Sequence, residues 1–339
     1  MASSSVRNAP SPMSVIFDLW AAWRTYAVAG GVRLDVFTHI ANGKRNAAEI
    51  AQAANASVRG MRGLLDALVG MGYLKKAGEK YSLTPLSAAY LVRGSELFME
   101  GAAEVAQVLA EDWAALPDAV RSGGPILRNR TAEQMSQFWP LLVKQIFPMS
   151  FTASTAAVKA LTAKERKRIG RILDIGAGSG AWSIGFAKAI PHARVTVVDL
   201  PVVVPVTREY AQRHGVAERY EYREGDYHSV DFGRDSYDLA ILGHILHGEG
   251  ERRSKELLRR INDALGPGGS LLIAEFVPND DRTGPAMALL FGLNMLLHAP
   301  EGDVFTMREY REWLKQAGFS KFRTVRNPNA PSPLIFATK

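Results

Sequence analysis

Three glycines and an aspartate carry the clearest chemical signal in this chain of 339 residues. Gly176, Gly178 and Gly180 follow a short apolar stretch, 171–175, and a second apolar stretch ends at Asp199. Glycines let a turn approach a ligand closely, so that the ligand can lie against main-chain N–H groups at the start of the next helix. An acidic side chain about twenty residues further on can bond ribose hydroxyls. The spacing indicates a pocket for a nucleoside-containing cofactor.

The position of the third glycine bears on which cofactor this is. Gly180 stands one position earlier than the dinucleotide pattern G-x-G-x-x-G requires, and no pyrophosphate-specific feature recovers that match. This disfavours NAD. The alternative that the glycines form an ordinary strand-to-helix turn without a ligand stays open.

A histidine and a glutamate supply candidate proton-transfer chemistry. His247 follows the apolar stretch 237–242, and Glu275 closes the apolar stretch 269–275. A single crossover helix between these stretches would place both residues at the ends of neighbouring strands. A histidine is the natural general base near neutral pH, and an adjacent carboxylate can fix its tautomer and stabilise the imidazolium. We expect a catalytic pair; the alternative is a capping histidine and a solvent-exposed glutamate.

The sequence favours chemistry without a metal. His244 and His247 are three residues apart with Glu249 nearby, but no third well-placed ligand follows. The chain contains no cysteine, which excludes disulfides, thiolate ligands and a cysteine nucleophile.

Strands and helices alternate from Gly170 onward, which is typical of a parallel sheet with helices on both faces. In such sheets ligands bind beyond the carboxyl ends of the strands. The expected strands are 171–175, 194–198, 219–223, 237–242, 269–275, 321–325 and 333–338. The residues expected to line one crevice at the strand ends are Asp174, Asp199, Asp226, Gly243 and Glu275.

The N-terminal part has a different pattern. Helical apolar spacing at 47–51 and 61–72 precedes a predicted hairpin, 73–76 and 81–84, which together make a winged-helix unit. Such a unit suggests a DNA-binding regulator as a second function class. The second helix offers Arg59 and Arg62 but is otherwise apolar, more like a packing face than a groove-reading one.

Charge and hydropathy set the expected surroundings of the protein. The net charge of +7 is spread over runs such as 164–168, which are read as solvated helix faces. Residues 1–12 lack the apolar run of a signal peptide, and no stretch resembles a membrane span. We expect a cytoplasmic protein with neither nucleic acid nor membrane as a partner.

The motif D-x-G-x-G-x-G at 174–180, the acid at Asp199, the turn 225–227 and the strand 237–242 resemble S-adenosylmethionine-dependent methyltransferases. With the winged helix included, the whole chain resembles the caffeic acid type of small-molecule O-methyltransferase and its bacterial relatives in secondary metabolism. His247 corresponds to the histidine of the family motif L-H-D-W.

This resemblance implies an α/β fold: a Rossmann-like doubly wound methyltransferase domain with an N-terminal, mostly helical winged-helix domain that builds a homodimer. The predicted division is 13–100 for dimerisation, 101–165 for a helical linker that contributes to the substrate pocket, and 166–339 for the methyltransferase domain.

The resemblance also implies the reaction. The enzyme would use S-adenosyl-L-methionine, release S-adenosyl-L-homocysteine, and methylate a hydroxyl of an aromatic or polyketide-like small molecule. His247 would be the base, oriented by Glu275. Predicted cofactor contacts are Asp174, Gly176, Gly178, Gly180, Asp199, Leu200, Gly225, Asp226, Tyr227 and Gly243. Predicted substrate contacts are Met149, Asn294, Met295 and His298, with Trp139 and Phe147 either in the pocket or in the core.

Three departures from the family pattern leave the acceptor atom open. Gly248 and Glu249 replace the Asp-Trp after the family histidine, Gly243 replaces a basic residue, and Val304 replaces a second acid that helps to hold the base. Asp303 or His298 could compensate for that acid. Because the family includes carbon- and nitrogen-methylating members, C- or N-methylation of an aromatic or heterocyclic metabolite remains the alternative. The sequence does not identify the acceptor.

Overall fold

The computed structural model describes residues 11–126, 132–325 and 332–339. The chain divides into two compact units, residues 1–107 and 108–339, and the boundary falls inside helix α7. It therefore lies within the predicted linker of 101–165; the three-part division itself stays a prediction.

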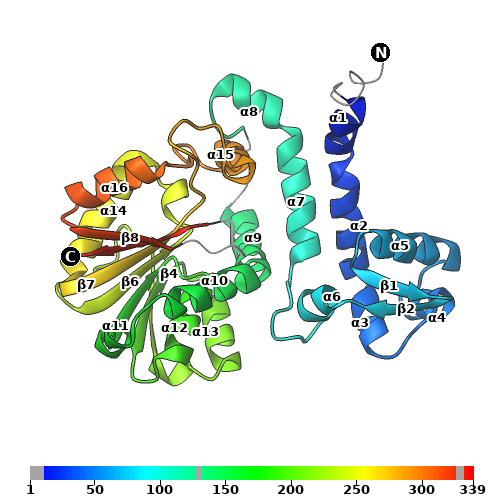
Figure 1. Ribbon diagram of the computed structural model, residues 1–339, viewed down its shortest axis with the longest axis horizontal. Coiled ribbons are helices and arrows are strands. Elements are labelled where there is room, and N and C mark those ends of the chain that lie inside the picture. The colour runs from blue at the N-terminus through cyan, green and yellow to red at the C-terminus, as the bar shows by residue number, and fades with distance from the viewer. Residues whose placement is uncertain (1–10, 127–131, 326–331) are drawn as a thin grey trace, which may run out of the picture. The chain divides into compact units, whose positions relative to one another are not determined.

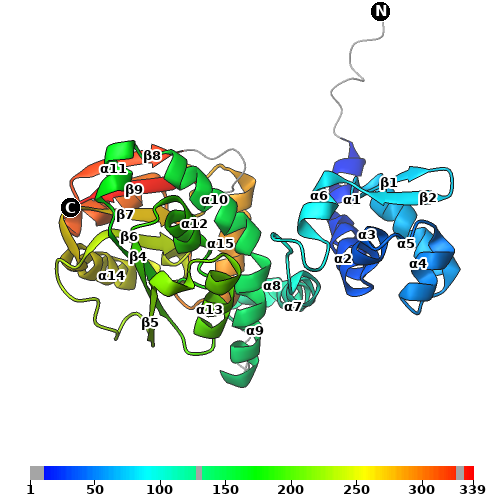
Figure 2. The same cartoon turned by 90° about the horizontal axis from the view of Figure 1, so that it is seen from below.

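The first unit is mostly helical and carries one small hairpin (Figure 2). Asp66, on the long helix before the hairpin, accepts hydrogen bonds from Lys76 Nζ at 2.7 Å and Tyr81 Oη at 2.8 Å, which tie the hairpin to that helix. The predicted winged-helix order of helix, helix and hairpin is confirmed. The elements are α1 (Pro12–Leu19), α2 (Ala21–Arg33), α3 (Val36–Ala41), α4 (Ala47–Ala53), α5 (Val58–Gly70), β1 (Leu74–Ala77), β2 (Lys80–Leu83), α6 (Pro85–Tyr90) and the start of α7 (Ala102–Ala114).

Local sequence signals explain where the helices of this unit begin. Asn46 and Glu49 form a reciprocal capping box at the start of α4, and Ser57 caps α5 by accepting from the N–H of Gly60. Apolar residues of α2–α5 and the hairpin then form one buried cluster, to which Phe37, Leu65 and Tyr81 belong.

The second unit is an α/β domain around a seven-stranded sheet (Figure 1). The strand order is β5-β4-β3-β6-β7-β9-β8, and all neighbours are parallel except β7 with β9 and β9 with β8. Helices α12 and α13 lie on one face of the sheet, and α14 and α16 on the other (Figure 1). The strands are β3 (Arg171–Ile175), β4 (Arg194–Asp199), β5 (Tyr220–Glu224), β6 (Tyr237–Gly243), β7 (Leu265–Ala274), β8 (Lys321–Val325) and β9 (Leu334–Thr338).

Helices and short 3₁₀ turns connect these strands and precede them. They are α8 (Leu116–Ser122), α9 (Ala132–Gln145), α10 (Phe147–Lys159), α11 (Ala163–Arg168), α12 (Ala181–Ala189), α13 (Val204–Arg213), η2 (Ala217–Arg219), η3 (Leu246–Gly248), α14 (Gly250–Ala264), α15 (Ala286–His298) and α16 (Met307–Gln316). No helix in the described part of the chain combines the length and apolarity that crossing a bilayer requires.

The seven predicted strands are confirmed, with one correction at β7. The strand expected at 269–275 starts four residues earlier, so that β7 runs from Leu265 to Ala274. Leu265 pairs with Tyr237, and the register then shifts before Ser270 pairs with Leu239. This irregularity absorbs the Gly-Pro-Gly-Gly sequence, because proline and glycine are tolerated in strands where the regular pairing is interrupted.

Candidate active site

Parallel strands bring the predicted site residues to one edge of the sheet. Strands β3, β4, β6 and β7 run in the same direction, so their carboxyl ends share that edge. Asp199 ends β4, Gly243 ends β6, and Glu275 comes directly after β7. Asp174 lies one residue before the end of β3, where its side chain is almost fully buried and burial raises its pKa to about 7.

The carboxylate of Asp199 is held by two main-chain donors beside the glycine turn. Its Oδ2 accepts from the N–H of Gly178 at 2.7 Å, and its Oδ1 accepts from the N–H of Leu200 at 2.7 Å. Burial raises the pKa of Asp199, and these two N–H groups oppose that effect. A carboxylate has about four acceptor positions. Each oxygen therefore keeps capacity for a further donor such as a ribose hydroxyl.

The N–H groups of the three glycines themselves already have acceptors within the protein. The N–H of Gly176 donates to Val198 O, that of Gly178 to Asp199, and that of Gly180 to Ala177 O. These glycines satisfy steric needs of the fold instead: a Cβ on Gly176 would come within 2.3 Å of Ile245, and its φ of +60° is left-handed. Their predicted cofactor contacts remain a prediction.

The predicted cofactor turn 225–227 starts beside Asp199. The N–H of Gly225 donates to Asp199 O at 2.9 Å, and Asp226 is exposed. The ring of Tyr227 lies 3.8 Å from the point where a Cβ on Gly176 would stand. The turn and the glycine loop therefore border the same space.

His247 and Glu275 form the predicted pair. His247 Nδ1 lies 2.7 Å from Glu275 Oε2, and the His247 N–H donates to Oε1 at 3.3 Å. Glu275 is fully buried, while the His247 side chain is 14% exposed. A carboxylate at Nδ1 makes that nitrogen the protonated one, so the lone pair lies on Nε2. No described residue hydrogen-bonds Nε2, which leaves this nitrogen able to accept a proton.

The charge state of Glu275 follows from a balance of opposing effects. Burial raises the pKa of the carboxyl, but the charge and hydrogen bond of His247, with a smaller effect of His244, hold it below the ordinary value. Glu275 therefore stays ionised and can stabilise an imidazolium at His247. The alternative of a solvent-exposed glutamate is wrong.

Neither proposed replacement for the second acid, Asp303 or His298, has the His247 ring among its hydrogen-bond partners in the described residues. Val304 is buried, and the Asp303 carboxylate accepts from the N–H of Val304 and pairs with Arg282. Instead, the main chain of Asp303 contributes: its N–H donates to His247 O at 3.0 Å. The loop after α15 thus holds the backbone of His247, and Glu275 holds its side chain.

His244 shapes the turn that presents His247. It has a left-handed φ of +64°, unusual for a residue with a side chain, and its N–H donates to Ala274 O. Its Nε2 lies 2.8 Å from Ser332 Oγ. Its Nδ1 is buried without a partner in the described ranges, and burial lowers the pKa of His244 to about 4.

Two phenylalanines that the sequence reasoning missed form an aromatic wall beside His247. Phe291 meets the His247 ring edge-on with centroids 4.8 Å apart, and Phe276 stacks on Phe291 at 4.0 Å. The signal was present, because Phe276 follows Glu275 directly and Phe291 is one helical turn before Asn294.

Two residues of α7 contact the polar groups of two predicted substrate residues on α15. Trp113 Nε1 donates to Asn294 Oδ1 at 3.2 Å, and Asp112 Oδ2 lies 2.8 Å from His298 Nε2. His298 Nδ1 lies 2.7 Å from Asn294 O, which can only accept. Both ring nitrogens of His298 are therefore engaged, Nε2 by the Asp112 carboxylate and Nδ1 by the main chain of α15.

The remaining predicted substrate residues differ in exposure. Trp139 on α9 is 36% exposed and Met149 on α10 is half-buried. Phe147 is fully buried and packs on Tyr210 with ring centroids 4.4 Å apart, as expected for a core residue. Met295 is also buried. Their contact with a substrate stays a prediction.

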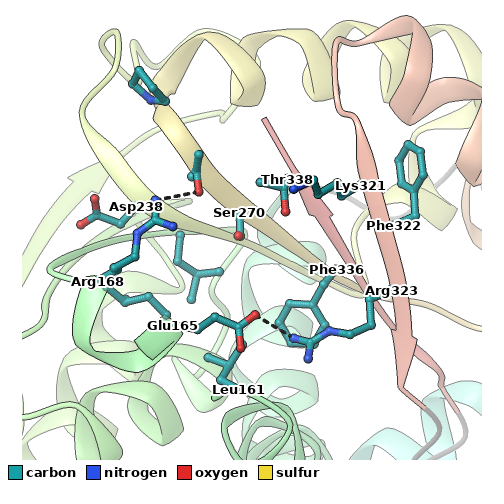
Figure 3. Close-up of a pocket in the computed structure, with 15 residues that line it drawn as sticks. Leu161, Glu165, Arg168, Asp238, Ser270, Lys321, Phe322, Arg323, Phe336 and Thr338 are labelled. Atoms are coloured by element: carbon teal, nitrogen blue, oxygen red, sulfur yellow. Dashed lines mark hydrogen bonds and ion pairs between the residues drawn. The ribbon is translucent and has the colours of Figure 1, made fainter. Parts of the chain in front are cut away.

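A cavity of about 250 Å³ lies at the opposite edge of the sheet (Figure 3). It is bordered by α11, the first parts of β6 and β7, and the β8–β9 pair. Its charged groups connect elements of the fold: Arg323 Nη2 pairs with Glu165, and Arg168 Nη2 donates to Gly268 O (Figure 3). Arg323 Nη1 also donates to Ala160 O. Since ligands of such sheets bind at the carboxyl ends, we assign this cavity a structural role.

Known proteins resemble the chain over nearly its full length. A protein from Streptomyces sahachiroi, 3-hydroxy-5-methyl-1-naphthoate 3-O-methyltransferase, is 32% identical over 90% of this chain and 88% of its own. The tetracenomycin polyketide synthesis 8-O-methyl transferase TcmO of Streptomyces glaucescens is 31% identical over 93% of both chains. The crystal structure of human N-acetylserotonin methyltransferase in complex with S-adenosylmethionine superposes with a TM-score of 0.82 at 25% identity, covering 99% of each chain.

Family models match both units of the chain. The O-methyltransferase dimerisation domain matches residues 23–93, and the O-methyltransferase domain matches residues 113–320. Together with the site at the strand ends and the similarity to the Streptomyces enzymes, these matches show that the chain belongs to the O-methyltransferase family that carries an N-terminal dimerisation domain.

Proposed function

We propose that the enzyme transfers a methyl group from S-adenosylmethionine to a hydroxyl of an aromatic or polyketide-like small molecule, with His247 as general base. The observation that carries this proposal is the His247–Glu275 pair, with Nε2 of the histidine free among the described residues and an aromatic wall next to it. The substrates named for the naphthoate and tetracenomycin relatives support the acceptor class.

The residues at the strand ends fit the proposed cofactor. Asp199 keeps acceptor positions for ribose hydroxyls after its two N–H bonds. Tyr227 and the exposed Leu200 supply apolar surface, and exposed Asp226 supplies an acceptor, for the adenine end. When bound, S-adenosylmethionine supplies an electrophilic methyl group on a sulfonium.

The protein contributes proton removal and orientation. A phenol has a pKa of about 10, so its proton must move to His247 Nε2 as the oxygen commits to attack. Glu275 accepts from Nδ1–H and balances the positive charge that develops on the ring. Phe276 and Phe291 offer flat apolar surface against which an aromatic acceptor can be oriented. Orientation of this kind lowers the barrier without further chemistry.

We further propose a homodimer built by the N-terminal unit. The match to the dimerisation domain supports this, as does a set of exposed apolar side chains along residues 13–26 of α1, α2 and the residue between them. Exposed apolar surface is typical of an association site. The set comprises Met13, Val15, Phe17, Leu19, Trp20, Trp23 and Tyr26. Light scattering after size exclusion should give twice the mass of 37.0 kDa for the chain.

Isothermal titration with S-adenosylmethionine and S-adenosylhomocysteine tests the cofactor site. The wild type should bind both, and Asp199→Ala should bind neither measurably while its thermal unfolding remains cooperative. No binding to ligand-free wild type would contradict the proposed function. C- or N-methylation by the same site is the alternative, and it predicts a product whose new methyl group is not a methoxy group.

A further inference from the structure

The family aromatic that follows the catalytic histidine is replaced here by Glu249, a residue that lies almost fully buried at 7% exposure. Its carboxylate accepts three charged or polar donors. Tyr227 Oη donates at 2.5 Å, Arg253 Nε at 2.6 Å, and His228 Nε2 lies at 2.6 Å. A buried carboxylate with this many partners fixes the side chains around it.

The carboxylate is ionised in this setting. Burial raises the pKa of Glu249, but Tyr227, Arg253 and His228 together hold it below the ordinary value. Because an ionised carboxylate only accepts, Tyr227 must donate its hydroxyl hydrogen, and His228 must carry hydrogen on Nε2. The orientation of both rings is thereby set.

Both rings belong to the segment that borders the proposed cofactor site. The segment 225–230 starts at the bond between Gly225 N–H and Asp199 O, and the Tyr227 ring faces Gly176. Arg260 holds the main chain of the same segment: its guanidinium donates to the carbonyls of Tyr227, His228 and Val230. Thus Glu249, the N-cap residue of α14, supplies a carboxylate for the side chains, and Arg260 of α14 supplies a guanidinium for the backbone.

We propose that Glu249 is a positioning residue for S-adenosylmethionine, which orients Tyr227 and His228 so that segment 225–230 forms a rigid wall for the adenosine end of the cofactor. Glu249 stands where the family motif L-H-D-W has its tryptophan. This inference rests on the proposed function, because it assumes the cofactor site.

Substitution of Glu249 should weaken cofactor binding and leave the chemical step nearly unchanged. In Glu249→Gln, the amide nitrogen cannot accept from Arg253 or His228, so the network loses at least one bond. We expect the Kd for S-adenosylmethionine and S-adenosylhomocysteine to rise about tenfold or more, and kcat at saturating cofactor to stay within about threefold of wild type. Tyr227→Phe, which removes a single hydroxyl, should raise Kd less, by about threefold to tenfold.

A matched control is available on the same helix. Glu256 pairs with Arg252 on the exposed side of α14, 3.1 Å away, and Glu256→Gln should leave both constants unchanged. If Glu249→Gln does not fold, the Kd of Tyr227→Phe for S-adenosylmethionine tests the proposed role of Glu249 by itself.

The outcomes separate this inference from the function on which it rests. Wild type that fails to bind the cofactor would contradict the function. Wild type that binds, with Kd unchanged within about twofold in both variants, would overturn the role of Glu249 alone. A fall in kcat with Kd unchanged would also overturn it, because the residue would then act on the chemical step.

Discussion

The indole of Trp182 occupies the space that a side chain at Gly243 would need. A Cβ on Gly243 would stand 2.2 Å from Trp182 Nε1 and 2.3 Å from Cδ1. Trp182 lies in the first turn of α12, directly after the glycine turn, and is 3% exposed. The basic side chain that the family has at this position is absent here, and the indole of Trp182, 61 positions earlier in the sequence, fills the space beside Gly243.

This relationship predicts a coupled pair of substitutions. Gly243→Ala should destabilise the protein by about 1–3 kcal/mol, because overpacking forces neighbouring atoms to move. In a Trp182→Leu background the same change should cost clearly less, a coupling that a double-mutant cycle measured by denaturant unfolding will show. Additive effects of the two substitutions would contradict the predicted contact.

Glu275→Gln tests the role of the buried carboxylate through the pH profile. Without its negative charge the imidazolium form of His247 is less stable, so the acidic limb of kcat/KM should move to lower pH. The rate on the plateau should fall by about tenfold or more, because the charge that develops on the ring loses its partner. An acidic limb that stays in place would show that this limb does not report on the His247–Glu275 pair.

His244→Asn tests the buried neutral histidine, since asparagine tolerates a left-handed backbone. The pKa of His244 is lowered from 6.5 to about 4, so the unfolded chain binds more protons than the folded one between these values. His244 therefore lowers the unfolding free energy progressively as the pH falls from 6.5 to about 4. The unfolding free energy of wild type minus that of the variant should rise with pH across this window. A constant difference would contradict the assignment.

Asp174 changes the unfolding free energy with pH in the opposite direction, over part of the same pH range. Its pKa is raised from 3.8 to about 7, so the folded chain holds the extra proton and loses stability as pH rises through this interval. Since Asp174 is unchanged in the variant, its contribution cancels in the difference.

Asp112→Ala tests the connection between α7 and α15. The substitution leaves His298 Nε2 without its buried partner, which should cost about 1–3 kcal/mol of stability. Because α15 also carries Phe291 of the aromatic wall, KM for the acceptor should rise while the Kd for S-adenosylmethionine does not. Asp118→Ala, which breaks an exposed pair with Arg121, is the control and should change stability by under about 1 kcal/mol. Equal effects of the two variants would contradict the prediction.

Sequence reasoning located the site because parallel-sheet geometry converts strand order into proximity. Once 237–242 and 269–275 were assigned to neighbouring strands, the meeting of His247 and Glu275 followed, although 28 residues separate them. Contacts that depend on helix packing could not be predicted in this way. Asp112 and His298 are 186 positions apart on helices whose relative placement has no sequence signature.

The glycines show a second limit of sequence reasoning. Their positions predicted the turn correctly, but the direction of each N–H depends on local angles that the residue type leaves free. Likewise the sequence shows Glu249 only as the replacement of a tryptophan, because its three partners come from α14 and from segment 225–230 and are revealed by the fold.

The most direct test of the central claim is methyl transfer from S-adenosylmethionine labelled with ¹³C in the methyl group to a panel of hydroxynaphthoates and polyketide phenols, followed by NMR. Wild type should give a labelled methoxy product, and His247→Ala should give none while its calorimetric binding of S-adenosylmethionine persists. A labelled methyl group on carbon or nitrogen, or a His247→Ala rate close to that of wild type, would contradict O-methylation with His247 as the base.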